Sequence, residues 1–286
     1  MTVVRRNVAL AAAVDRLRAA GVASPEHDAA ELLAHVHGLE RRDLFRIDTL
    51  AGEQAERFET LIARRVAREP LQHLTGAAYF RHVELAVGPG VFVPRPETEL
   101  LAGWAIESAL RAEHENRTCR VVDLCTGSGA IAKAVADEVP DADVHAVELD
   151  ESAHGWAERN LAGTGVDLRQ GDMGHAFDDL LGTVDVVVCN PPYIPLEAWE
   201  SVAVEARDHD PHLALFSGDD GLDAIRLLAV RAALLLRPGG VVGTEHADAQ
   251  GESVPAVFAA TGRWVDVVDH HDLAGRPRFT TARLAR

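Results

Sequence analysis

The sequence contains few cysteines and no long apolar run. Cys119, Cys125 and Cys189 are odd in number and lack Cys-x-x-Cys spacing. This argues against a disulfide framework and a zinc site, so we expect reduced thiols and no metal. No stretch approaches the roughly 20 apolar residues of a membrane span, and the start of the chain lacks the apolar segment of a signal peptide. We therefore expect a cytoplasmic protein without a membrane segment.

Basic residues are scarce after residue 76. Residues 1–76 hold 11 arginines and 11 acidic residues, whereas residues 77–286 hold 34 acidic and 17 basic residues. The formal charge of −17 therefore lies downstream, on a surface poorly suited to nucleic-acid phosphates. Bare DNA or RNA is a disfavoured substrate. The acidic charge either serves solubility or steers a basic protein partner, and the composition leaves both open.

A length of 286 residues predicts one large domain and one smaller domain. Residues 1–76 have the cap and stop signals of a small helical domain. We expect helices from Asn7, as cap, to Gly21, from Ser24 to Gly38, and from about Glu53 to near Pro70. Residues 77–96 contain aromatic and β-branched residues around Gly88-Pro89-Gly90, which predicts a hairpin connector.

Residues 97–286 alternate between helical segments and short apolar strands, the pattern of a parallel α/β sheet covered on both faces. Strands are predicted at Arg120–Leu124, Asp143–Glu148, Val184–Cys189, Gly240–Glu245, Val265–Asp269 and Arg278–Leu284. No internal repeat or low-complexity stretch interrupts this pattern. The expected architecture is an α/β catalytic domain preceded by a helical domain and a β-hairpin.

A glycine turn between the first of these strands and the next helix indicates a nucleotide-like ligand. It contains Cys125-Thr126-Gly127-Ser128-Gly129, and Glu148 follows about 20 residues later at a strand end, suited to ribose hydroxyls. The turn alone also fits a dinucleotide. However, Asp123, Glu148 and Asp172 all lie at predicted carboxyl ends of strands, and such an acidic rim suits the cationic S-adenosylmethionine better than a pyrophosphate.

The segment Asn190-Pro191-Pro192-Tyr193 follows an unbroken apolar strand. Two prolines cannot continue a sheet ladder, so the chain leaves the sheet with carbonyl oxygens preset beside the Asn190 amide. Such acceptors can bind both protons of a planar amide or aniline-like nitrogen and favour its pyramidalisation toward a methyl donor. Tyr193 can stack on the flat group. The motif predicts methylation of a planar nitrogen, with no separate general base.

With these residues in place, the chain resembles the PrmC/HemK family, the glutamine methyltransferases that modify peptide chain release factors. The likeness spans nearly the full length. It rests on Asn190–Tyr193 and on the segments Arg68–Gly76, Phe92–Leu101, Asp210–Leu215 and Gly218–Leu222. Cys125 stands where the family often has Gly, Glu148 where Asp is frequent, and Met173 where an aromatic residue can cover the adenine.

The resemblance implies a Rossmann-like class I S-adenosylmethionine-dependent methyltransferase, with the catalytic domain at 97–286. Cys125–Gly129 would line the cofactor, Glu148 would hold its ribose, and Asp172 and Met173 would flank its adenine. Asn190–Tyr193 would grip the glutamine of a release factor's Gly-Gly-Gln loop, leaving S-adenosylhomocysteine as product. The helical domain would bind the release factor, and we expect a monomer.

Alternative substrates remain open. A relative that methylates a glutamine of a ribosomal protein typically reads Pro-Arg-Ser-Pro where this chain reads Pro94-Arg95-Pro96-Glu97. Methylation of a nucleic-acid amino group would use the same Asn-Pro-Pro-Tyr chemistry, but the acidic excess opposes it. A nicotinamide-dependent dehydrogenase would leave Asn190–Tyr193 unexplained, and a non-enzymatic adaptor would bind no cofactor.

Overall fold

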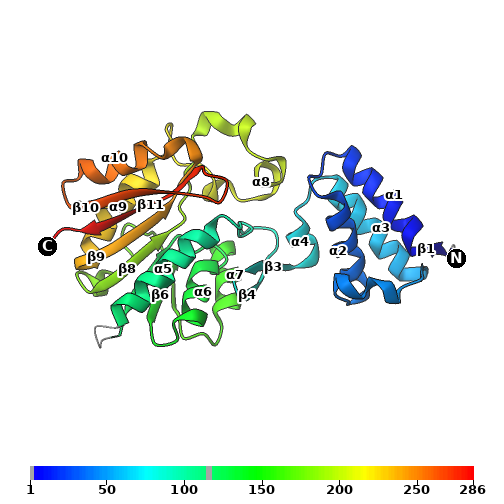
Figure 1. The fold of residues 1–286 in the computed structure, drawn as a ribbon, viewed down its shortest axis with the longest axis horizontal. Coiled ribbons are helices and arrows are strands. Elements are labelled where there is room, and N and C mark those ends of the chain that lie inside the picture. Colours follow the sequence, from blue (N-terminus) through cyan, green and yellow to red (C-terminus); the bar gives the residue numbers. More distant parts are fainter. Residues whose placement is uncertain (1–2, 114–117) are drawn as a thin grey trace. The chain divides into compact units, whose positions relative to one another are not determined.

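The structure is a computed structural model that describes residues 3–113 and 118–286. Residues 1–2 of the predicted first domain and 114–117 of the predicted third lie outside the described residues. The chain divides into two compact units (Figure 1). One contains the chain up to Ala77 together with Ala203–His209, and the other contains Ala78–Val202 and Asp210–Arg286. Residues 203–209, which the sequence analysis included in the catalytic domain, therefore group with the helical unit.

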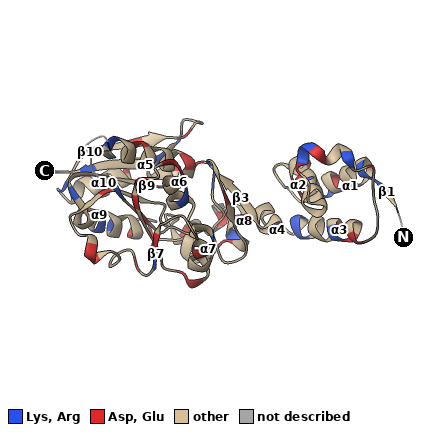
Figure 2. Ribbon diagram, turned by 90° about the horizontal axis from the view of Figure 1, so that it is seen from below, with Lys and Arg blue, Asp and Glu red and all other residues tan. Residues whose placement is uncertain are grey.

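The first unit is helical. Its elements are β1 (Val4–Arg5), α1 (Arg6–Ala19), α2 (Pro25–His37), the 3-10 helix η1 (Arg41–Arg46), β2 (Thr49–Leu50), α3 (Gly52–Val66), α4 (Leu71–Thr75) and α8 (Val204–His209). Its core is a cluster of buried side chains that includes Leu17, Leu32, Leu33, Phe58 and Ile62. Figure 2 shows basic and acidic residues on α1, α2 and α3, in line with the charge balance of this part of the sequence.

The helix signals of this unit are mostly confirmed. Pro25 is the first residue of α2, and Gly38 ends it with a φ of 63°. The prediction that Asn7 caps α1 is wrong, because α1 already begins at Arg6 and, among the described residues, the Asn7 side chain accepts only from the adjacent Val8 amide. The short α4, which begins after Pro70, was not predicted.

The second unit contains a seven-stranded sheet in the order β10-β11-β9-β8-β5-β6-β7. Its strands are β5 (Arg120–Leu124), β6 (Asp143–Glu148), β7 (Asp167–Gln170), β8 (Val184–Cys189), β9 (Leu236–Glu245), β10 (Trp264–His271) and β11 (Pro277–Leu284). The five strands β7, β6, β5, β8 and β9 run parallel to one another. β11 is antiparallel to β9, and β10 is antiparallel to β11. The predicted α/β class is thus confirmed, but the sheet is mixed and not wholly parallel as predicted, because β11 and β10 pair antiparallel.

Helices cover both faces of this sheet (Figure 1). They are α5 (Thr98–Glu113), α6 (Ala130–Glu138), α7 (Glu151–Leu161), α9 (Asp223–Leu235) and α10 (Ser253–Ala260). Apolar residues of α5, α6 and α7 form one buried cluster with the sheet, and those of α9 and α10 form another. Within residues 3–113 and 118–286, no helix is long and apolar enough to cross a membrane.

The hairpin consists of β3 (Ala77–Phe80) and β4 (Val83–Ala86). Its turn is formed by Arg81 and His82, so the prediction that Gly88-Pro89-Gly90 form the turn of the hairpin is wrong, although Pro89 and Gly90 form a separate turn after β4. Those residues follow β4, where a Cβ on Gly88 would lie 2.7 Å from the Trp156 ring. Gly88 is therefore required for close packing against α7.

Candidate active site

The predicted glycine turn directly follows β5. Cys125, Gly127 and Gly129 have φ values of 62°, 58° and 84°, in the left-handed region that is unfavourable for side chains with a Cβ. A Cβ on Gly129 would approach the Leu161 side chain to 3.0 Å, whereas a Cβ on Gly127 would meet nothing within 4 Å. Gly129 thus allows the turn to pack on α7, and open space remains beside Gly127.

Asp123 lies beneath this turn rather than on an open rim. Its side chain is buried, and Oδ2 accepts from Thr126 Oγ1 at 2.6 Å and from the Ala132 amide at 3.2 Å. Oδ1 is buried without a hydrogen-bond partner among the described residues. Burial raises the pKa of Asp123 to about 7. Asp123 therefore braces the turn and can act on a bound cation only through its charge.

Glu148 ends β6, the strand next to β5. Its Oε2 accepts from the Gly127 amide at 2.8 Å and its Oε1 from the Asp150 amide at 2.9 Å. Burial raises its pKa. Because each carboxylate oxygen has two lone pairs, each retains one acceptor position. Two adjacent acceptors of this kind suit a pair of neighbouring hydroxyls, such as those of a ribose.

Asp172 and Met173 follow β7, at the same edge of the sheet. The exposed Asp172 accepts from the Gly174 amide at 2.7 Å through Oδ1. Met173 is buried, and its Sδ lies 3.5 Å from Cys125 Sγ. The predicted cofactor residues Cys125–Gly129, Glu148, Asp172 and Met173 therefore lie at the carboxyl ends of three adjacent strands.

The turn Asn190–Tyr193 lies beside the glycine turn, because Cys189 at the end of β8 pairs with Leu124 at the end of β5. The following segment is held in place by its backbone: Ile194 donates to the Leu215 carbonyl at 2.9 Å and accepts from the Ser217 amide at 3.0 Å. The structure thus brings the predicted chemical residues next to the predicted cofactor residues.

Polar contacts hold the side chains of this turn. Asn190 Nδ2 donates to Thr98 Oγ1 at 3.3 Å, and Tyr193 Oη donates to Glu245 Oε1 at 3.1 Å. Burial, together with the neighbouring Glu245, raises the pKa of Tyr193. The Tyr193 carbonyl accepts from Gln250 Nε2 at 2.9 Å. Asn190 Oδ1 makes no hydrogen bond within the described part of the chain and remains available as an acceptor.

Sequence reasoning missed four residues that support this turn: Thr98, Gly221, Glu245 and Gln250. A Cβ on Gly221 would lie 2.3 Å from the Tyr193 carbonyl oxygen. Thr98 belongs to Phe92–Leu101 and Gly221 to Gly218–Leu222, two segments that carried the family resemblance. Glu245 is an acid at the carboxyl end of a predicted strand, the signal that had identified Glu148.

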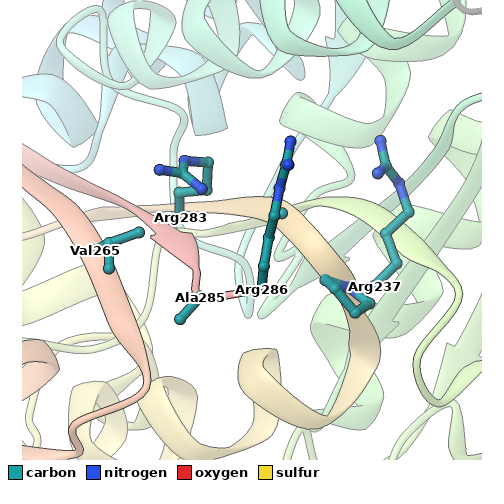
Figure 3. A pocket seen from close by; sticks show the side chains of 7 residues that line it. Arg237, Val265, Arg283, Ala285 and Arg286 are labelled. Atoms are coloured by element: carbon teal, nitrogen blue, oxygen red, sulfur yellow. The ribbon is translucent and has the colours of Figure 1, made fainter.

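A separate surface pocket of ≈ 550 Å³ lies at the opposite, amino-terminal end of β9 (Figure 3). It is lined in part by Arg237, Val265, Arg283 and Arg286. Arg237 pairs with Asp185, and Arg283 pairs with Asp266. The site at the carboxyl ends of the strands is therefore distinct from this pocket. No group of three or more potential metal ligands occurs within residues 3–113 and 118–286.

Comparisons with known proteins match both parts of the chain. The model of the PrmC N-terminal domain matches residues 8–76, and that of the methyltransferase small domain matches residues 105–206. The chain is 60% identical to the release factor glutamine methyltransferase of Streptomyces coelicolor, over 96% of this chain and 97% of that one. It is 46% identical to the enzyme of the same name from Mycolicibacterium smegmatis, over 99% of both chains.

Two further matches are of another kind: one is a similar protein with a different name, and the other is a solved structure that shares the fold. A 4-amino-L-phenylalanine/4-methylamino-L-phenylalanine methyltransferase of Streptomyces pristinaespiralis is 45% identical over 90% of this chain and 88% of its own length. Among solved structures, the hMettl16 catalytic domain in complex with the MAT2A 3′UTR hairpin 6 covers 70% of this chain and 75% of its own. Its TM-score is 0.52 at 14% identity, so this likeness concerns the fold alone.

Proposed function

The chain belongs to the release factor glutamine methyltransferase family, and we propose that it methylates the glutamine of the Gly-Gly-Gln motif in bacterial peptide chain release factors. The methyl group would pass from S-adenosylmethionine to the side-chain amide nitrogen. The observation that carries this proposal is the position of Asn190, which has a free Oδ1 and directly follows β8, the strand paired with the one that leads into the glycine turn.

The residues present fit the cofactor. Open space beside Gly127 and the remaining acceptor positions of Glu148 suit an adenosine ribose. Asp172 and Met173 would flank the adenine, and the charge of Asp123 beneath Cys125–Gly129 favours a cation. When bound, S-adenosylmethionine supplies an electrophilic methyl group on a sulfonium.

The Asn190–Tyr193 turn would act on the substrate amide. An amide nitrogen is a weak nucleophile because its lone pair is delocalised. Asn190 Oδ1 and the carbonyls of the proline turn would accept hydrogen bonds from its two N–H groups and favour a pyramidal nitrogen, which stabilises the transition state. The methylated nitrogen would then lose one proton to these oxygens or to water. Tyr193 would pack against the flat group. Residues 1–76 would bind the release factor, with 77–96 as connector and 97–286 as catalytic domain.

The test is an incubation of the purified protein with radiolabelled S-adenosylmethionine and four separate acceptors: release factor, ribosomal protein, RNA and 4-amino-L-phenylalanine. We expect label on the release factor, lost when its Gly-Gly-Gln glutamine is replaced by alanine. The aniline acceptor is included because a 45% identical relative carries that name. Label only on RNA, on the ribosomal protein or on the small amine would overturn the proposal.

Two substitutions separate the cofactor and substrate roles. We expect Asn190→Ala to lower kcat by about 10²-fold or more, the scale of a lost transition-state hydrogen bond, with little change in cofactor Kd. Glu148→Ala should instead weaken cofactor binding by about tenfold or more, because a charge-assisted hydrogen bond contributes about 1.5–3 kcal/mol. Calorimetry and methyl-transfer kinetics measure the two quantities. Loss of cofactor affinity in Asn190→Ala would show that the substrate site is misplaced.

A further inference from the structure

One buried asparagine connects the β3–β4 hairpin to the glycine turn. Asn160 lies in the last turn of α7, is 6% exposed, and binds main-chain groups of two other segments. Its Oδ1 accepts from the Ala86 amide at 2.7 Å, and its Nδ2 donates to the Ala86 carbonyl and to the Ser128 carbonyl, each at 2.9 Å. Ala86 ends β4, and Ser128 lies in the glycine turn after β5.

The partners of Asn160 fix the orientation of its amide group. The Ala86 N–H can only donate and the two carbonyls can only accept, so Oδ1 must face the N–H and the NH₂ must face the carbonyls. Both hydrogens of the NH₂ are then used. Asparagine is a poor helix former, and among the described residues its side chain bonds no group of α7. The contribution of Asn160 therefore lies in its contacts outside the helix.

The glycine turn depends on this side chain at one peptide bond. The peptide between Ser128 and Gly129 is held at both ends, because its carbonyl accepts from Asn160 and its N–H donates to the Thr126 carbonyl at 2.9 Å. Ser128 is 3% exposed, so water cannot readily replace a lost donor there. Without the Asn160 amide, the Ser128 carbonyl would be left unpaired, and the peptide would rotate to find another donor.

The hairpin depends on the same side chain. A two-stranded hairpin is only marginally stable by itself, and β4 lies beside α6 and α7 (Figure 1). Asn160 binds both main-chain polar groups of Ala86, as a neighbouring strand would. Trp156, one turn earlier on α7, donates from Nε1 to the Pro89 carbonyl at 3.2 Å. α7 therefore holds the end of the hairpin, and Asn160 ties that end to the glycine turn.

We infer that Asn160 is a positioning residue for the proposed methyl transfer: it holds the glycine turn in the shape that receives the cofactor and couples that shape to the order of the hairpin. The identity of the cofactor in this inference rests on the proposed function. Asn160 acts through the Ser128 carbonyl. Because one amide group serves both segments, order in either segment should favour order in the other, and such a coupling is reciprocal.

The first test uses no ligand and is therefore independent of the proposed function. Hydrogen exchange of single amides, followed by NMR, compares the wild type with Asn160→Ala. We expect Ala86 and Gly129 to exchange about tenfold faster or more in the variant, the scale of one lost buried hydrogen bond. Val254→Ala, which removes buried methyl groups from α10 in the other apolar cluster, is the control for a general loss of stability. Equal acceleration of Gly129 in the two variants would overturn the inference, since Gly129 keeps its own acceptor in both.

Asn160→Asp decides the matter if Asn160→Ala does not fold. An ionised aspartate keeps the shape of the side chain and the acceptor for the Ala86 amide, but it offers no donor to the Ser128 carbonyl. Faster exchange of Gly129 in Asn160→Asp supports the inference, and unchanged exchange of Gly129 contradicts it.

The second test measures the binding of S-adenosylhomocysteine, the expected product, by calorimetry. Asn160→Ala should raise its Kd by about tenfold, whereas kcat at saturating S-adenosylmethionine should fall by less, the opposite of the split expected for Asn190→Ala. In the wild type, S-adenosylhomocysteine should slow exchange of the Ala86 amide by about fivefold or more, the low end of a typical coupling. An unchanged Kd in Asn160→Ala, or an unchanged Ala86 rate with S-adenosylhomocysteine bound, would refute the inference. A wild-type protein that binds no S-adenosylhomocysteine would instead refute the proposed function, and the ligand-free exchange would still decide the role of Asn160.

Discussion

Cys125 illustrates what a single backbone angle determines. Its φ of 62° lies in the left-handed region, which disfavours any Cβ by about 1–2 kcal/mol and would suit glycine better. The side chain contacts Met173 and lies beside Cys189, whose pKa is raised by burial and by this neighbour. The small side chain of Cys125 thus packs beside two sulfur-containing residues, Met173 after β7 and Cys189 at the end of β8.

Asp123 predicts a pH dependence of cofactor binding. Its pKa is raised by burial to about 7, and a cation bound at the turn favours the ionised form. Below about pH 7, binding must therefore release a proton, so affinity should rise as pH increases toward 7 and level off above it. Calorimetric titration with S-adenosylmethionine from pH 5.5 to 8.5 measures this. Asp123→Asn should bind with a flatter profile, any remaining slope being due to Glu148, whose pKa is also raised.

The control for this titration is Asp179→Asn. Asp179 has a pKa lowered to about 2 by Arg169 and stays ionised throughout the range. Asp179→Asn should therefore leave the pH profile of cofactor affinity unchanged. An unaltered slope in Asp123→Asn would mean that another group releases the proton.

Some residues of the site could be predicted from the sequence, and others could not. The glycine turn, Glu148 and Asn190–Tyr193 have local sequence signals, and the structure gathers them at one sheet edge. Thr98 lies 92 residues from Asn190, and Glu245 lies 52 residues from Tyr193. Nothing in the local pattern links such pairs, because their contact depends on how α5 and β9 pack around β8.

At the scale of elements, apolar strands were the most predictable. β5, β6 and β8 have the predicted bounds because at least half of the residues of each are apolar and each strand has a neighbour on both sides. β7 was missed, since Asp167-Leu168-Arg169-Gln170 contains one apolar residue and needs no more at an edge. The hairpin turn was misplaced because Arg81, with a φ of 51°, occupies a conformation that the sequence would assign to glycine.

The close contact between Gly221 and the Tyr193 backbone predicts that a side chain at position 221 lowers both stability and kcat. Gly221 has a φ of 75°, and a Cβ there would lie 2.3 Å from the Tyr193 carbonyl oxygen and 2.9 Å from Gln250 Nε2. Gly221→Ala should therefore destabilise the fold by about 1–3 kcal/mol from overpacking, in addition to the strain of positive φ. Because the displaced atom belongs to the Asn190–Tyr193 turn, we also expect kcat to fall by about tenfold or more.

Gly182→Ala is the control that separates the strain of a positive φ from displacement of the Tyr193 carbonyl. Gly182 has a similar φ of 69°, but a Cβ there would meet nothing within 4 Å. This variant should show the strain cost alone, about 1–2 kcal/mol, with unchanged kcat. Thermal melting and methyl-transfer kinetics measure both variants side by side. Equal losses of stability and kcat in Gly221→Ala and Gly182→Ala would mean that the contact with Tyr193 affects neither quantity.

At the scale of the whole molecule, the division of the chain differs from the sequence-based one. The chain leaves the second unit after Val202, contributes α8 to the first unit, and returns at Asp210. Within the first unit, Glu205 of α8 accepts from Arg65 at 2.9 Å and from Arg68 at 2.6 Å, and Arg65 also pairs with buried Asp28 at 2.8 Å. These partners lie 137–140 residues from Glu205, so no local pattern could reveal them.

This ion cluster predicts an acid-sensitive attachment of α8. Burial alone would raise the pKa of Glu205, but hydrogen bonds from Arg68 and Arg65 outweigh it and lower the pKa to about 2. The unfolded state therefore binds this proton more readily, so the stabilisation is complete above an ordinary glutamate pKa of about 4.5. The stabilisation by Glu205 is lost progressively as pH falls from about 4.5 toward 2.

Glu205→Gln should remove this stabilisation already at neutral pH. Breaking a buried ion pair costs about 3–5 kcal/mol, and the partial exposure of Glu205 reduces the expected loss to about 2 kcal/mol. Hydrogen exchange of the amides in 203–209 measures it, since exchange reports local opening. At neutral pH those amides should exchange about 30-fold faster in Glu205→Gln than in the wild type, and wild-type protection should decline between pH 4.5 and 2 after correction for intrinsic rates. Glu197→Gln, at an exposed glutamate, should leave protection unchanged. Full protection of 203–209 in Glu205→Gln would show that apolar packing alone holds α8.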